Sequence, residues 1–280
     1  MSETWRQFWH LLKRDVPAFI ALIWLVLTVI LCTWGYFTVQ TASLRQNLNM
    51  RLIPPGTSHG LAYLLGTDGL GRSYVERLLV AGATSLVIAA SVVAISAVIG
   101  GALGIISGNA PSAVDTVIMR VCDVIMAFPS MLLALIALYT ISTSPVVLIG
   151  VLAFTRLPIY IRTARGEALR TRGLLYISAA RMSGTRPMAV TFRHIVRAAL
   201  PAVWTLVTFE IALTMLTESG LSFLGVGIQP PGASWGLLVS DGQTYLYSSW
   251  WVAVLPGIAI MATAVALRVL GGVVSSVLEG

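Results

Sequence analysis

Six runs of mostly apolar residues, each about as long as a membrane-spanning helix, dominate this sequence of 280 residues. An α-helix rises about 1.5 Å per residue and the hydrocarbon core of a bilayer is about 30 Å thick, so each run could cross a membrane. Only 10% of the residues are Asp, Glu, Lys or Arg, against about 25% in an ordinary soluble domain. The sequence therefore predicts an all-α, polytopic membrane protein with six transmembrane helices. The runs are residues 17–39, 85–107, 124–141, 146–161, 198–216 and 250–267.

The basic residues predict how these spans are oriented. The chain has 18 Lys and Arg against 11 Asp and Glu, a net charge of +7. With the N-terminus in the cytoplasm, the inner segments hold thirteen of the basic residues and the outer segments hold four, while Arg156 lies within a span. Cytoplasmic loops carry an excess of Lys and Arg, so both termini are predicted to be cytoplasmic. The basic charge then reflects topology, and we expect no nucleic-acid partner.

The connections between the runs divide a single predicted transmembrane domain, residues 1–280, into inner and outer parts. Residues 1–16 form the predicted cytoplasmic N-terminus, and residues 162–197 form a cytoplasmic loop rich in arginine. Residues 40–84 and 217–249 form two outer loops. We expect Pro201, near the start of the fifth run, to open its helix.

The sequence has few of the common motifs that would indicate catalysis or cofactor binding. Lys13 is the only lysine and follows two leucines, so the chain has no G-x-x-x-x-G-K-[ST] loop for ATP. Cys32 and Cys122 form no C-x-x-C or Cys/His cluster, and the three histidines are scattered. No H-E-x-x-H motif occurs. We therefore expect a non-catalytic protein with no metal site and no cofactor of its own.

One segment of the cytoplasmic loop is suited to contact with another protein. Ser178, Ala179 and Ala180 are followed by Arg181 and then by Gly184. Small side chains on an exposed helix let the surface of a partner come close. The other interpretation is that this basic loop lies on anionic headgroups of the membrane, which attract its arginines.

Several segments, in order along the chain, resemble one family of transport proteins. Ser178-Ala-Ala-x-x-x-Gly184 resembles the coupling motif E-A-A-x-x-x-G of ABC importer permeases, with Ser178 in place of the glutamate. The string Phe192-Arg-His-Ile-Val-Arg197 is similar to F-R-H-I-L-P of dipeptide, oligopeptide and nickel permeases. Leu65-Gly-Thr-Asp-Gly-Leu-Gly-Arg72 resembles their L-G-T-D-x-x-G-R-D, with Ser73 in place of the last Asp. Residues 119–129 and 221–236 are similar to further blocks of the family.

The resemblance implies a type I ABC importer in a bacterial cytoplasmic membrane, with this chain as its C-type permease. Such an importer has a second related permease, two ATPase subunits that use ATP and Mg²⁺, and an extracellular or periplasmic binding protein that delivers the substrate. Peptides are the expected substrate, with nickel or a metal chelate as the alternative. A stand-alone proton-coupled transporter is the rival class. The ATPases are expected to contact Ser178, Ala179, Ala180, Arg181 and Gly184.

Two acidic residues in and after the fifth run are candidates for the translocation path. Glu210 and Glu218 are eight residues apart, about 80° around a helix, and so lie loosely on one side. Acids within a span usually face a cavity or a partner rather than lipid. Two alternatives are open: lining the path for an amino-bearing substrate, or pairing with Arg156 or with the second permease.

Sequence spacing also predicts structural contacts. Asp68 and Arg72, four residues apart, are expected to pair and fix a tight turn, and Asp123 is expected to pair with Arg120. Glycines at every fourth position from residue 100 to residue 108 allow close helix packing, more within the chain than between subunits. The outer-loop turn consists of Gly66, Thr67, Asp68, Gly71 and Arg72.

Overall fold

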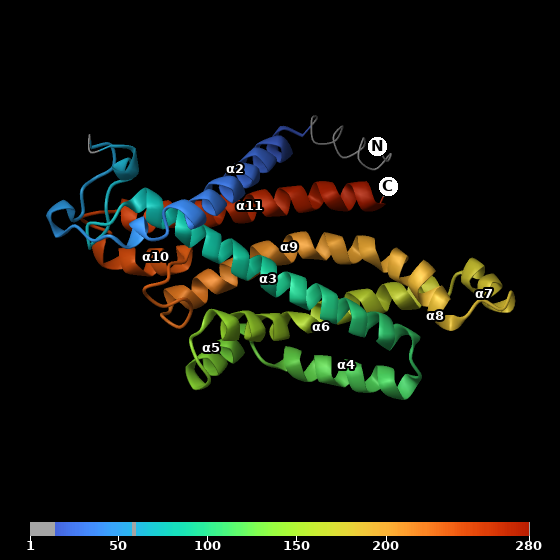
Figure 1. Ribbon diagram of the computed structural model, residues 1–280. Helices are drawn as coiled ribbons and strands as arrows, with labels where there is room; N and C mark the ends of the chain where they lie inside the picture. Colours follow the sequence, from blue (N-terminus) through green and yellow to red (C-terminus); the bar gives the residue numbers. More distant parts are fainter. Residues whose placement is uncertain (1–14, 58–59, 280) are drawn as a thin grey trace.

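The computed structural model describes residues 15–57 and 60–279, which form a bundle of long helices (Figure 1). Within these ranges no β-strand occurs, and one isolated β-bridge joins Thr67 and Ser73. The predicted all-α class is confirmed. The α-helices are α2 (Val16–Thr38), α3 (Tyr74–Asn109), α4 (Ser112–Ala127), α5 (Ser130–Thr140), α6 (Pro145–Arg172), α7 (Leu175–Met182), α8 (Pro187–Val190), α9 (Val196–Phe223), α10 (Trp235–Gly242) and α11 (Trp251–Glu279). The short turns are η1 (Ala42–Leu44), η2 (Leu48–Met50), η3 (Leu61–Tyr63), the π-helical η4 (Thr191–Ile195) and η5 (Gln243–Tyr245).

Five of the helical segments in the described ranges are long and apolar enough to cross a membrane, and a bent pair supplies a sixth candidate. The five are α2, α3, α6, α11 and the continuous stretch Pro187–Phe223, which joins α8, η4 and α9. The bent pair is α4 with α5. The chain is thus a multi-pass helical membrane protein, as predicted. The orientation of its termini across the membrane stays a prediction.

The prediction of one straight helix over residues 124–141 is wrong. The chain bends by 83° between α4 and α5, and α4 begins already at Ser112. Phe128 has an extended backbone, with ψ of 135°, and Pro129 follows it. Proline has no N–H for the helix ladder and disfavours a helical conformation in the residue before it, so the helix stops at this pair.

The other spanning helices, except for α2, extend well beyond their apolar runs. α3 has 36 residues and is therefore about 54 Å long, more than the thickness of the hydrocarbon core. Most of the predicted loop 162–197 is helical, because α6 continues to Arg172 and α7, α8 and η4 follow. Pro201 does not open its helix but lies inside α9, and Pro187 stands at the start of α8 instead.

The glycines of α3 pack this helix against α6 of the same chain. A Cβ added to Gly100 would lie 2.6 Å from the Cβ of Tyr160, and one added to Gly108 would lie 2.7 Å from the Cβ of Ala168. Real side chains do not approach so closely, so these positions need glycine. Packing within the chain, the favoured alternative, is confirmed.

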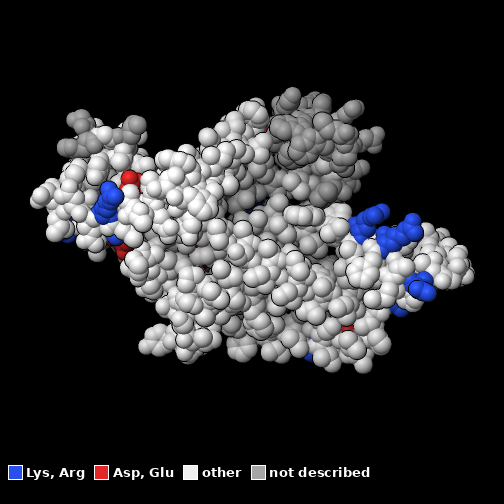
Figure 2. Space-filling view, viewed as in Figure 1, with Lys and Arg blue, Asp and Glu red and all other residues white. Residues whose placement is uncertain are grey.

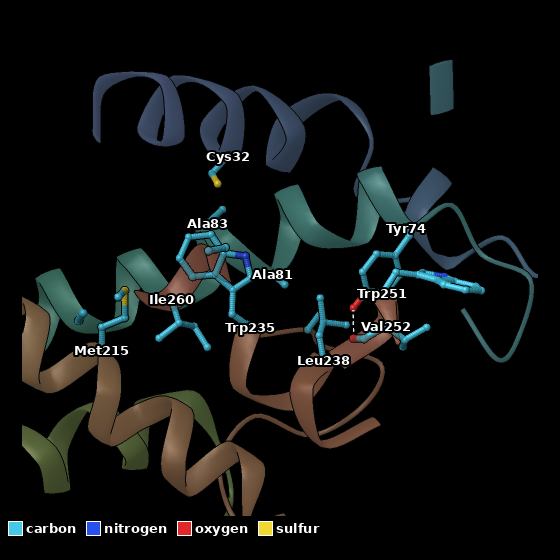
Figure 3. Close-up of a cluster of buried hydrophobic side chains, with 13 residues drawn as sticks. Cys32, Tyr74, Ala81, Ala83, Met215, Trp235, Leu238, Trp251, Val252 and Ile260 are labelled. Atoms are coloured by element: carbon cyan, nitrogen blue, oxygen red, sulfur yellow. Dashed lines mark hydrogen bonds between the residues drawn. The ribbon is translucent and has the colours of Figure 1, made fainter. Parts of the chain in front are cut away.

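The two ends of the bundle differ in how completely they are packed. We call the end built from residues 40–57, 60–85 and 218–252 the α10 end, and the end built from residues 167–197 the α7 end (Figure 1). At the α10 end, Trp235 and Trp251 are buried and their indole N–H groups donate to the carbonyls of Leu78 and Thr67, at 2.9 and 3.2 Å. Figure 3 shows both indoles within an apolar cluster, beside the hydrogen bond from the Tyr74 hydroxyl to the Val252 carbonyl.

The start of α2 and the end of α11 lie side by side, toward the α7 end of the molecule (Figure 1). Ala18 of α2 and Val273 of α11 belong to one small buried cluster there. Both ends of the described chain therefore lie on the side of the bundle that carries α7, as an even number of spans requires.

Candidate functional site

Helix α7 projects from the bundle, between the end of α6 and the start of α8 (Figure 1). Ile177 is fully buried and anchors the helix, and the Tyr176 ring packs edge-on against His194 at 5.7 Å between centroids. The rest of α7 has little cover: the side chains of Leu175 and Met182 are 89% and 84% exposed. Apolar side chains so exposed mark a surface that a partner can bury.

The predicted coupling residues all lie on α7 or at its C-terminal end. Ser178, Ala179 and Gly184 are exposed and Ala180 is half-buried, while the side chain of Arg181 lies outside the described part of the chain. Gly184 has φ of +79°, and the N–H of Thr185 donates to the Ala180 carbonyl at 3.2 Å. This is a Schellman C-cap, in which a left-handed residue ends the helix. Gly184 is therefore required by backbone conformation, and a Cβ added there would meet open space.

Arginines gather around α7, whereas the middle of the face shown in Figure 2 has very few. Arg193 and Arg197 line a small cavity of about 280 Å³ together with Tyr176 and His194. An excess of Lys and Arg is typical of a cytoplasmic membrane face, and the α7 end is the end predicted to lie on that side. The exposed arginines here are Arg170, Arg172, Arg186, Arg193 and Arg197.

Glu210 is paired within the chain. Its side chain is 3% exposed, and Oε2 lies 3.5 Å from Nε of Arg156 on α6. Arg156 also donates from Nη2 to the Thr217 hydroxyl at 2.9 Å. The predicted pairing with Arg156 is confirmed, and the pair ties α6 to α9. The role of Glu210 in lining the translocation path stays a prediction.

Glu218 is buried in a group of serines rather than beside a cation. It has no exposed surface, and it accepts hydrogen bonds from Ser85 at 3.2 Å and from Ser222 at 2.7 Å. Ser85 in turn accepts from the N–H of Trp235 at 3.2 Å. Glu218 thus joins α3, α9 and α10. Sequence reasoning missed Ser85 because it lies 133 residues from Glu218 in the chain. Ser222 is four residues after Glu218 on the same helix, so helical spacing could have indicated that contact.

The predicted outer-loop turn is present at the α10 end. Asp68 accepts from the N–H groups of Leu70 and Arg72, each at 2.9 Å, and its Oδ2 lies 2.6 Å from Nε of Arg72. Gly66 and Gly71 have φ of +83° and +71°, so both need glycine. The Asp68–Arg72 pair is confirmed. It closes a tight turn of the outer loop rather than one turn of an α-helix.

A second ion pair was predicted with the wrong partner. Asp123 lies 2.5 Å from Nη2 of Arg162 on α6, not beside Arg120. Sequence reasoning also missed Arg77, which is buried between Asp68 and Asp241 at 3.5 and 3.7 Å. Burial raises the pKa of Asp241, and the charge of Arg77 lowers it only in part. Asp123 and Arg162, like Arg77 and Asp241, are far apart in the sequence, so local spacing could not pair them.

Comparison with known proteins assigns this fold to a class. Residues 100–278 match the family described as "Binding-protein-dependent transport system inner membrane component". The chain is 34% identical over 233 residues to the probable D,D-dipeptide transport system permease protein DdpC of Escherichia coli K12, covering 83% of this chain and 77% of that protein. It is 32% identical over 268 residues to the dipeptide transport system permease protein DppC of the same strain, covering 95% and 89%. It is 30% identical over 267 residues to the glutathione transport system permease protein GsiD of Pectobacterium atrosepticum, covering 95% and 88%.

The helices and these likenesses together define a multi-pass membrane permease of the ABC transporter type. The chain belongs to the family of binding-protein-dependent transport system inner membrane components. A permease of this kind works in a complex with ATPase subunits and a binding protein.

Proposed function

We propose that this chain is the C-type permease of a peptide importer in a bacterial cytoplasmic membrane. It forms half of the translocation pathway together with a second, related permease. Two ATPase subunits bind at the α7 end and hydrolyse ATP, and the chain itself has no catalytic role. Relatives that cover most of the chain are named for dipeptide and glutathione transport, which supports a peptide rather than nickel as the substrate.

The observation that carries this proposal is the incomplete cover of α7. The helix presents the small residues Ser178 and Ala179 beside the exposed Leu175 and Met182, at the end of the molecule where the arginines gather. It is also connected directly to two spanning helices, because α6 ends at Arg172 and the stretch that contains α9 begins at Pro187. A displacement of α7 by an ATPase would therefore be passed to α6 and α9.

The experiment enlarges one exposed side chain of α7, so that the packing of α7 against the rest of the chain is not disturbed. Ala179→Trp places a large side chain on an exposed position. Overpacking a close contact costs about 1 to 3 kcal/mol, and about 1.4 kcal/mol weakens an association tenfold. We expect the variant to insert and to pair with the second permease, but to lose the ATPases in pull-down and to lose substrate-stimulated ATP turnover.

Ala189→Trp is the matched control, because Ala189 is an exposed alanine of the same inner segment but lies on α8. It should retain the ATPases and ATP turnover. If α7 merely lay on lipid headgroups, both tryptophans would be tolerated. Wild-type recovery and turnover with Ala179→Trp would overturn the coupling role of α7.

A second experiment addresses the rival class of stand-alone transporter. The purified chain is reconstituted alone into liposomes with a proton gradient, and uptake of a labelled dipeptide is measured. We expect no uptake and no ATP hydrolysis until the partner subunits are added. Accumulation of the dipeptide by the chain alone would contradict the importer.

A further inference from the structure

A polar cavity of about 550 Å³ lies at the α10 end, between the outer-loop turn and the segment that contains α10. Tyr74, Leu238 and Val252 line it, and Figure 3 shows these three residues close together, with the Tyr74–Val252 hydrogen bond among them. Three arginines and two aspartates also line the cavity, and they come from three separate stretches of sequence. These are Arg51, Arg72, Arg77, Asp68 and Asp241.

Arg77 has hydrogen-bonding capacity that the chain does not fill. Its side chain is 4% exposed, and its Nε has no hydrogen-bond partner. The nearest carboxylate oxygens, of Asp68 and Asp241, are 3.5 and 3.7 Å away, whereas charge-assisted N–H···O bonds measure about 2.7 to 2.9 Å. A buried guanidinium so loosely paired carries a desolvation cost that a closer carboxylate would offset.

The two aspartates do not supply that closer carboxylate. Asp68 is committed to Arg72, since its two oxygens already accept two backbone N–H groups and the Arg72 Nε. The Asp241 side chain is 45% exposed and stays 3.7 Å from Arg77. The three guanidinium groups and two carboxylates leave the cavity with one positive charge in excess.

The rim of the cavity has the composition of a protein interface. Arg51 is exposed and donates only a long hydrogen bond, 3.4 Å, to the Tyr245 hydroxyl. Leu48 and Leu70 also line the cavity and are 67% and 38% exposed. Arginine, tyrosine and exposed apolar side chains around a pocket are typical of surfaces that bind another protein.

We propose that this cavity receives an acidic side chain of the substrate-binding protein, whose carboxylate pairs with Arg77 and Arg51. This inference rests on the proposed function, which places the α10 end outside the membrane, where a binding protein would dock. Asp241 competes with the incoming carboxylate for Arg77, so it sets the affinity from within the cavity.

The test measures the affinity of the cognate binding protein for the assembled transporter in nanodiscs, at low and high salt. Arg51→Glu should weaken binding about tenfold or more and reduce its salt dependence, because it removes an attraction and adds a repulsion. Arg45→Glu is the matched control: Arg45 is exposed in the same outer loop but does not line the cavity, and we expect less than a twofold change. Asp241→Asn should tighten binding severalfold, because it releases Arg77.

The possible results distinguish a failure of the docking proposal from a failure of the importer proposal. Equal effects of Arg51→Glu and Arg45→Glu, or weaker binding by Asp241→Asn with an unchanged melting temperature, would overturn the cavity as the docking site and leave the importer intact. No binding of the binding protein to the wild-type complex would overturn both. The dipeptide Ala-Ala, added without the binding protein, is the second arm. Stimulation of ATP turnover that depends on Arg51 would show that the cavity takes a free peptide, and would overturn the proposed protein partner.

Discussion

The α10 end and the α7 end of this permease are built in opposite ways. At the α10 end two buried tryptophans, a turn closed by Asp68 and Arg72, and the serine-bound Glu218 satisfy one another inside the chain. At the α7 end, Leu175 and Met182 are almost fully exposed and the arginines have few acidic neighbours. The difference teaches that the chain itself fixes most of the first end, apart from the cavity around Arg77, whereas it leaves α7 at the second end largely uncovered. Under the proposed function, another protein completes the α7 end.

The largest expected effect comes from comparing two left-handed glycines, Gly71 at the α10 end and Gly184 at the α7 end. A Cβ added to Gly71 would collide with the carbonyl oxygen of Asn47, whereas one added to Gly184 would meet nothing. Gly184→Ala therefore costs only the strain of a left-handed residue, about 1 to 2 kcal/mol. Gly71→Ala must also open its turn, and we expect it to cost more than about 4 kcal/mol, which is exceptional for one substitution.

Thermal unfolding of each variant in mild detergent measures this difference. Gly71→Ala should yield little folded protein, and Gly184→Ala should melt only slightly below the wild type. Equal melting temperatures for the two variants would show that the α10 end is no more self-contained than the α7 end.

The next effect concerns one ion pair at each end. Asp68→Asn leaves Arg72 and the buried Arg77 without their shared carboxylate, and breaking such a buried pair costs about 3 to 5 kcal/mol. Glu167→Gln breaks the Glu167–Arg170 pair at the end of α6, where the Arg170 side chain is 73% exposed, and pairs of this kind contribute about 0.3 to 0.5 kcal/mol. Melting temperatures should fall sharply for Asp68→Asn and hardly at all for Glu167→Gln. A similar fall for both would contradict the contrast between the ends.

An effect smaller than those of Gly71→Ala and Asp68→Asn is expected between the ends, at the Arg156–Glu210 pair. Glu210→Gln leaves a partly buried arginine without its countercharge, which costs about 1 to 3 kcal/mol. The double variant Arg156→Gln/Glu210→Gln removes both charges and should recover much of that loss. If Glu210 lines the translocation path instead, Glu210→Gln would melt like the wild type and slow the uptake of amino-bearing peptides. Melting curves and uptake assays on the same preparations distinguish the two roles.

Local sequence patterns predicted the parts of this structure that depend on local chemistry. The apolar runs located the spans, the four-residue spacing placed Asp68 beside Arg72, and the glycines from Gly100 to Gly108 marked the close packing of α3 on α6. Hydropathy did not give the helix lengths, because it measures contact with lipid, while α3 continues into the packed α10 end. The signal for the bend at Pro129 was present in the Phe128-Pro129 pair, but the apolar run hid it.

Contacts between distant segments could not be predicted in this way. The Asp123–Arg162 pair and the hydrogen bond from Ser85 to Glu218 depend on how helices lie beside one another, and no spacing along the chain encodes that. The same holds for the cavity around Arg77, whose lining comes from separated segments. The proposed coupling role rests on the exposure of α7. That exposure depends on how the helices of the bundle pack, so the sequence alone could not predict it.

Hydrogen exchange of backbone amides, measured on the chain in nanodiscs with and without its ATPase subunits, tests most directly whether the α7 end is completed by those subunits. Addition of the ATPases should slow exchange at residues 175–186 and leave residues 66–77 of the α10 end unchanged. Equal exchange at residues 175–186 in both samples, with the ATPases demonstrably bound, would contradict the account.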